Sequence, residues 1–117
     1  MHTGTKFRPQ PEITRLKEAV GILNAEDPDM PIARLVVLMD IYHHEGTPFH
    51  EIVSRTGLPR SNVSRHVAKL DIYGYPKSPH GSGLVYSVED MDNRRQRLIY
   101  LTEAGRRLAK RLTEAMR

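Results

Sequence analysis

The stretch GLPRSNVSRHVAKL, residues 57–70, decides the fold of this 117-residue chain. Gly57 can supply the left-handed residue that ends one helix, and Pro59 is tolerated only at the start of the next. Val63, Val67 and Leu70 then recur at helical spacing, which predicts a helix from about 59 to 73 with one buried side. With a short helix before it, this segment has the dimensions of a helix-turn-helix over 48–73.

The opposite side of this helix carries donors, cations and small side chains. At about 100° per residue, five side chains project away from the apolar row: Ser61, Asn62, Arg65, Ala68 and Lys69. A forked arginine matches guanine, an amide matches adenine and a small residue fits beside a thymine methyl, so the set suits the major groove of DNA. An ordinary amphipathic helix with a solvated face is the competing interpretation. Three flanking residues are candidates for phosphate contacts: Arg60, Ser64 and His66, of which His66 could equally be packed inside.

Two apolar runs behind the helix predict a β-hairpin, or wing, over 84–101. Its tip and exit are basic because they contain Arg94, Arg95 and Arg97. Arginine at a hairpin tip can enter the narrow minor groove, where the negative potential is enhanced. The alternative is a pair of local salt bridges to the acidic residues at 90 and 92. We expect both to hold in part, with one arginine bracing the hairpin and another contacting DNA.

The charge along the chain is distributed unevenly around a net value of +4. Residues 1–53 carry a net −3, residues 54–80 carry +4, residues 81–93 carry −3 and residues 94–117 carry +6. An acidic front half and a basic rear half favour a polyanion as the partner of the rear half. A well-solvated helix face would also account for the basic residues.

The composition excludes several classes of function. The chain has no cysteine, so disulfides, thiolate nucleophiles, Cys-based zinc sites and thiol redox sensing are ruled out. No apolar run approaches the roughly 18 residues that cross a bilayer, and the N-terminus lacks a signal-peptide core. We therefore expect a cytoplasmic, nucleoid-associated protein. No catalytic arrangement is apparent, so we expect neither an enzyme nor a cofactor. His43 and His44 point about 100° apart on a helix, so we do not expect a metal site there.

The remaining segments complete a single domain over residues 11–117, preceded by a loose arm over 1–10. Helical apolar stripes predict terminal helices at 11–25 and 103–117, and a wide apolar face places a second helix, from Pro31, at the centre of the core. The Gly- and Pro-rich residues 74–83 read as a loop. The stripes of the terminal helices need a partner, and a homodimer is the commonest one. The alternative is that both stripes pack back on their own subunit.

Two of these segments carry a family resemblance. The run VEDMDNRRQRLIYLTEAG, residues 88–105, resembles the wing and following helix of the multiple-antibiotic-resistance regulators, the MarR family, whose pattern is approximately D-x-x-D-R-R-x-x-x-x-x-L-T-x-x-G. Residues 58–70 look like that family's recognition helix, and the resemblance covers about 31–112. It implies a mainly α fold with a small β-hairpin, a winged helix-turn-helix whose terminal helices form a dimer. It also implies that Arg65 and its neighbours read bases, while an arginine of the pair at 94 and 95 contacts the minor groove.

The sequence departs from the family pattern in three places. Asn93 stands where the family often has Asp. The interaction of that Asp with a wing arginine would therefore be weaker here, or Asp90 would make it instead. Residues 75–82 are extra, which can change how the wing sits. The sequence ends at Arg117, where family members usually continue into another dimerisation helix, so dimerisation is expected to rest on the 11–25 and 103–117 helices or to differ altogether.

These observations favour a sequence-specific regulator of transcription that binds double-stranded DNA. The simplest form is a repressor acting as a homodimer on a pseudo-palindromic operator. A winged-helix adaptor that binds a protein of the transcription machinery, with little specific DNA binding, is the alternative. A regulator that senses a small apolar effector stays open as a third, although the sequence shows no polar anchor for such a ligand.

Overall fold

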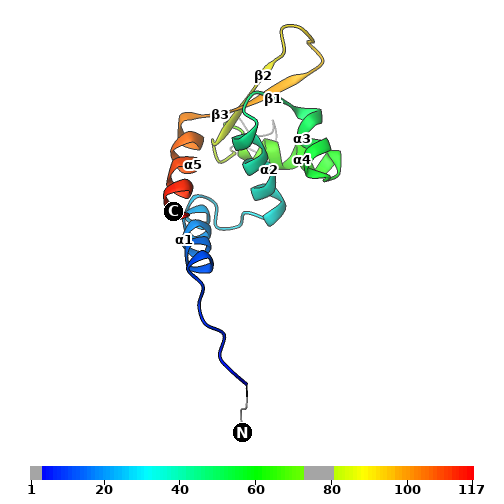
Figure 1. The fold of residues 1–117 in the computed structure, drawn as a ribbon. Coiled ribbons are helices and arrows are strands. Elements are labelled where there is room, and N and C mark those ends of the chain that lie inside the picture. The colour runs from blue at the N-terminus through cyan, green and yellow to red at the C-terminus, as the bar shows by residue number, and fades with distance from the viewer. Residues whose placement is uncertain (1–3, 73–80) are drawn as a thin grey trace.

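A computed structural model describes residues 4–72 and 81–117, which form five helices and one small antiparallel sheet (Figure 1). The elements follow one another as α1 (Pro11–Glu26), α2 (Ile32–His43), β1 (Thr47–Pro48), α3 (Phe49–Thr56), α4 (Arg60–Leu70), β2 (Val85–Glu89), β3 (Arg97–Leu101) and α5 (Glu103–Ala115). The predicted fold class, mainly α with a β-hairpin in a winged helix-turn-helix, is confirmed.

The turn between α3 and α4 is built as the sequence predicts. Gly57 ends α3 with a φ of 70°, in the left-handed region, and its N–H donates to the carbonyl of Val53. Pro59 precedes α4 with a φ of −56°. Gly57 adopts the left-handed conformation that most other residues avoid, and Pro59 has a fixed φ, so the angle between the helices is set within three residues.

The sheet has a third strand that the sequence analysis did not predict. We expected Thr47 to cap the first helix of the pair and Pro48 to be its first residue, but the two form β1, which pairs with β3 through Thr47↔Ile99 and Pro48↔Leu98. The strand order β1-β3-β2 leaves β1 at an edge, where proline is tolerated because a free N–H is not needed. A strand of two residues is too short to show a periodic pattern.

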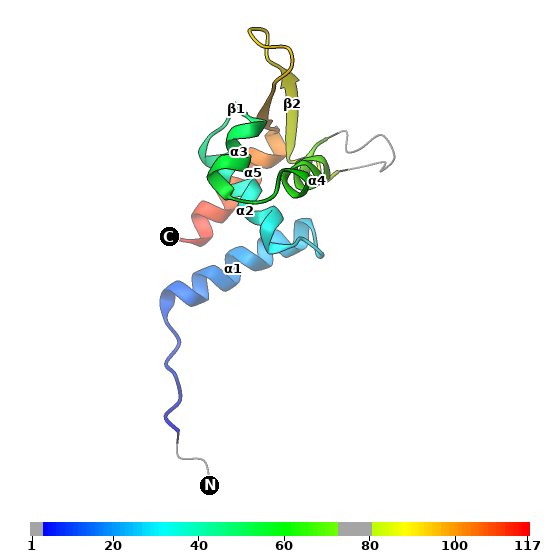
Figure 2. The ribbon, with the colours of Figure 1, turned by 90° about the vertical axis from the view of Figure 1, so that its right-hand side faces the viewer.

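Helix α4 ends earlier than predicted, at Leu70 instead of about 73. Asp71 adopts an extended conformation and forms a parallel bridge with Val85. The carbonyls of Lys69 and Leu70 accept hydrogen bonds from the N–H groups of Ser82 and Leu84, at 2.8 and 2.9 Å. The wing therefore rises directly beside the end of α4 (Figure 2). Of the predicted loop at 74–83 and the extra residues at 75–82, those up to 80 lie outside the described residues.

The core lies where α2, α3, α4 and the sheet meet. Its fully buried side chains come from all of these elements: Val37, Ile41, Ile52, Val63, Leu70, Leu84, Val85 and Ile99. One side of α2 lies at the centre of the core, as predicted, but other apolar side chains of this helix remain exposed. Ile32 is 81% exposed, and Met39 and Tyr42 are about half exposed.

Helix α1 packs against α5, with Ala19 and Leu23 buried and Glu26 paired with Arg111 across the contact. The rest of its apolar stripe, Ile13, Leu16 and Val20, is about half exposed. Residues 4–10 of the predicted arm are exposed, form no helix or strand, and extend away from the body (Figure 1). In residues 4–72 and 81–117, no helix has both the length and the apolar character required for a transmembrane span.

Two helical glycines should respond oppositely to alanine. A Cβ at Gly105, at the start of α5, would overlap the main-chain oxygen of Leu84, whereas a Cβ at Gly21 in α1 would meet nothing within 4 Å. Gly105→Ala should lower the free energy of unfolding by about 1–3 kcal/mol through overpacking. Gly21→Ala should raise it by roughly 0.5–1 kcal/mol because alanine is the better helix former. Urea denaturation of both variants measures this, and equal effects would contradict the close approach of α5 to Leu84.

Candidate nucleic-acid interface

The two sides of α4 are separated as the spacing predicted. Val63, Val67 and Leu70 are buried in the core. Of the five side chains predicted to face DNA, Ser61, Arg65 and Lys69 are exposed, and Asn62 and Ala68 are partly buried. Their exposure is compatible with reading a groove, and their contact with DNA stays a prediction.

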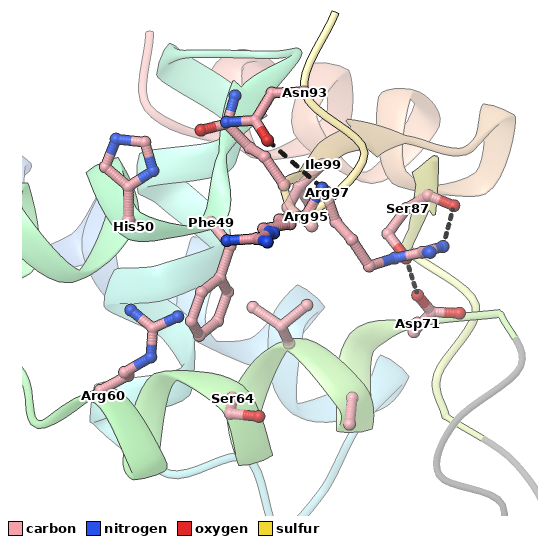
Figure 3. Close-up of a pocket in the computed structure, with 13 residues that line it drawn as sticks. Phe49, His50, Arg60, Ser64, Asp71, Ser87, Asn93, Arg95, Arg97 and Ile99 are labelled. Carbon is pink, nitrogen blue, oxygen red and sulfur yellow. Dashed lines mark hydrogen bonds between the residues drawn. The ribbon is translucent and has the colours of Figure 1, made fainter. Parts of the chain in front are cut away.

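A pocket of about 520 Å³ separates α4 from the wing (Figure 3). Arg60, Ser64 and Ala68 line it from α4, and Arg95 and Arg97 line it from the wing. The guanidinium of Arg60 lies over the ring of Phe49, 5.1 Å from its centroid, so this predicted phosphate contact is oriented by a cation–π interaction. The pocket thus brings together cations from both elements.

Asp90 organises the tip of the wing without either arginine. Its Oδ1 accepts from the N–H of Asp92 at 2.9 Å, and its Oδ2 accepts from Nε2 of Gln96 at 2.8 Å. The side-chain oxygen of Asn93 accepts from the main-chain N–H of Arg95. The expected brace between a wing arginine and an acidic residue is therefore wrong for the described structure. Amide and main-chain donors satisfy the carboxylate, and both tip arginines stay exposed.

Two sets of arginines in the described residues differ in their ion pairs. Five arginines of the helical body form salt bridges with acidic side chains within 4 Å: Arg34, Arg55, Arg106, Arg107 and Arg111. Within residues 4–72 and 81–117, no ion pair involves any arginine of α4 or the wing: Arg60, Arg65, Arg94, Arg95 and Arg97. In the described part of the chain, no carboxylate within 4 Å neutralises these five guanidinium groups.

His66 does not belong to this surface. It is only 9% exposed, and its Nδ1 accepts a hydrogen bond from Nε of Arg34 at 3.4 Å. Arg34 also pairs with Asp27 in the turn after α1, at 3.1 Å. The predicted phosphate contact of His66 is wrong, because the imidazole lies inside. Its place three residues after Val63 and four before Leu70, on the buried side, was the signal for this.

The environment of His66 favours the neutral imidazole. Burial lowers its pKa below the ordinary 6.5, and the positive charges of Arg34 and Arg65 lower it further. The hydrogen bond from Arg34 also requires an unprotonated Nδ1.

The described part of the chain contains no group of three or more His, Asp or Glu residues placed to hold a metal ion. His43 and His44 stack edge to face at the end of α2, with ring centroids 5.0 Å apart.

The lowered pKa of His66 makes folding stability depend on pH. Above pH 6.5 both the folded and unfolded states keep the imidazole neutral, so the group contributes no pH dependence. As the pH falls below that value, the unfolded chain takes up the proton first, so the free energy of unfolding decreases. The free energy of unfolding can be measured by urea denaturation from pH 8 to pH 5, about 1.5 units on either side of the ordinary pKa. Over this range the wild type should lose stability relative to His66→Gln. Parallel curves for the two proteins would contradict this assignment.

Comparisons with known proteins bear on the fold. A scan against protein-family models finds no match, and a search of curated proteins finds none. Among solved structures, the transcriptional regulator PcaV from Streptomyces coelicolor, in complex with its natural ligand, is 25% identical, with a TM-score of 0.60 over 87% of this chain and 67% of that one.

Two further structures are similar at lower identity. A mutant of S. aureus MepR bound to an oligodeoxyribonucleotide is 22% identical, with a TM-score of 0.63 over 86% of this chain and 66% of that one. A MarR transcriptional regulator from Methanosarcina mazei is 18% identical, with a TM-score of 0.63 over 89% and 64%. The chain spans about two thirds of the length of these regulators. It has the winged-helix fold of the MarR-family regulators, as the resemblance of its wing sequence implied.

Proposed function

We propose that the protein is a transcriptional regulator that binds double-stranded DNA at specific sequences. The main support for this proposal is which arginines form ion pairs with carboxylates and which do not. Five arginines of the helical body are paired with carboxylates, whereas within residues 4–72 and 81–117 no arginine of α4 or the wing has such a partner. A polyanion of regular spacing is the partner that such a surface fits.

The shared fold supports the same partner. PcaV is a transcriptional regulator, and the MepR structure contains an oligodeoxyribonucleotide. Both structures match this chain over 86–87% of its length. In this proposal the protein binds chromosomal DNA and is therefore located in the cytoplasm, at the nucleoid.

In this proposal α4 and the wing make different contacts with DNA. The outward side of α4, with Ser61, Asn62 and Arg65 near its start, enters the major groove and reads base edges. The wing arginines contact phosphates or the adjacent minor groove and contribute affinity with little sequence information. Bound in this way at a promoter, the protein acts most simply as a repressor by occluding it.

We further propose that the protein acts as a homodimer. The exposed stripe of α1 and an apolar groove of about 560 Å³ between α2 and α5 leave apolar surface on the side away from the wing. Met39, Tyr42 and Met116 line this groove. A two-fold dimer through these helices would present two reading helices roughly 34 Å apart and would bind a pseudo-palindromic operator.

Arg65→Ala tests the reading role of α4. Fragments selected from random duplex DNA by the wild type supply a specific site, and a mixed-sequence duplex supplies the non-specific reference. Loss of a bidentate base contact should cost about 1–3 kcal/mol on the selected site and leave non-specific binding nearly intact. Lys17→Ala, on the exposed side of α1, is the matched control and should change neither affinity.

Equal losses on both DNAs would show that Arg65 contacts phosphate and does not read a base. A wild-type protein that is not retained on mixed-sequence duplex at low salt would favour the adaptor function over DNA binding.

Charge placed in the exposed stripe of α1 tests the homodimer. Leu16→Glu and Val20→Glu should each halve the molar mass measured by light scattering, because a carboxylate cannot be buried there without a partner. Lys17→Glu lies between them on the polar side of the same helix and should keep the mass of two chains. A wild-type protein with the mass of one chain would contradict the proposal.

A further inference from the structure

The side chain of Arg97 is exposed but folds back across the hairpin. Its Nε donates to Oγ of Ser87 at 3.1 Å, and its Nη2 donates to the main-chain oxygen of the same serine at 3.1 Å (Figure 3). The residue directly opposite Arg97 in the sheet is Glu89, so the contact with Ser87 is diagonal. Two hydrogen bonds to one residue fix the plane of the guanidinium.

Ser87 is in turn connected to the end of the reading helix. Its Oγ donates to Oδ2 of Asp71 at 3.5 Å. Asp71 directly follows Leu70, the last residue of α4, is 8% exposed, and bridges to β2 at Val85. A continuous contact therefore runs from the end of α4 through Ser87 to Arg97, and a shift of the wing relative to α4 would break it.

The two bonds leave much of the guanidinium available. Of its five N–H groups, Nε–H and one on Nη2 are used in the part of the chain that the structure describes. The other three belong to Nη1 and Nη2, on a side chain that lines the pocket between α4 and the wing with Arg60 and Arg95. A planar fork held in one orientation matches two oxygens of a phosphate.

We propose that Arg97 is a preorganised phosphate contact and that Ser87, backed by Asp71, is the positioning residue that holds it. The proposal rests on the proposed binding of DNA and specifies how one contact of that interface is built. Arg94 provides the contrast, because it is exposed at the tip and no hydrogen bond of its side chain occurs within the described residues. Arg94 must lose rotamer freedom when it binds, whereas Arg97 has already lost it.

Ser87→Ala separates this role from a simple structural one. The substitution keeps the charge of Arg97 and the main-chain acceptor but removes Oγ, so the arginine becomes mobile. Affinity for a fixed duplex should fall about 3- to 10-fold, the cost of immobilising one long side chain. The slope of log K against log salt should stay unchanged, since the same number of phosphates is contacted. Arg97→Ala, in contrast, should reduce that slope by about one unit.

A double-mutant cycle shows whether Ser87 acts through Arg97. In the Arg97→Ala background, Ser87→Ala should cost less than about 2-fold, because its effect on the arginine has disappeared. Ser54→Ala, at an exposed serine of α3, is the matched control and should leave affinity unchanged in both backgrounds. Thermal unfolding of each variant shows that loss of affinity is not loss of fold.

The lysine variants give a second, independent comparison. Arg97→Lys should weaken binding about as much as Ser87→Ala, because an ammonium cannot make both bonds to Ser87 and also present a fork. Arg94→Lys should change affinity less than about 2-fold, since a mobile point charge serves equally at the tip.

The outcomes distinguish this proposal from the function on which it rests. A wild-type protein that does not bind duplex DNA overturns the proposed function. A wild type that binds, with Ser87→Ala neutral or equally costly in both backgrounds, overturns only the positioning role.

Discussion

The structure depends on the return of the chain to the end of α4. Ser82 and Leu84 donate to the last carbonyls of the helix, and Ile72 donates to Val85, so the helix terminus and the first wing strand are joined by main-chain hydrogen bonds. A Cβ at Gly81 would overlap the main-chain oxygen of Asp71, so this approach requires a glycine. Through these contacts the end of α4 is joined to the first strand of the wing, and the two elements border one surface.

Most of the fold could be predicted because it is determined locally or by long periodic patterns. Gly57 permits a left-handed turn, Pro59 restricts its own φ, and the apolar rows of α1, α2 and α5 repeat over several turns. The errors occur where distant parts of the chain compete for a short segment. Residues 47 and 48 form β1 because they pair with β3 at the edge of the sheet. Helix α4 ends at Leu70 because the next residue, Asp71, pairs with Val85 of β2. Neither event leaves a periodic signal.

The candidate site was predictable to the extent that helical spacing determines it. Spacing separates the outward Ser61 and Arg65 from the buried Val63 and Val67, and the same spacing places His66 inside. The wing differs, because Asp90 has several donors nearby in the sequence and only the folded turn decides among them. The partner of Arg97 depends on strand register and on a diagonal reach, neither of which can be read from residue types.

The division of the arginines gives the fold and the basic surface different responses to dissolved ions. The pairs of Arg34 with Asp27 and of Arg55 with Asp40 are partly buried, with side-chain exposures of 11–27%, and are screened only weakly. Contacts between the α4–wing surface and a phosphate matrix are screened far more, because they depend on releasing condensed counterions. On a heparin or phosphocellulose column, a moderate chloride gradient should therefore elute the protein still folded.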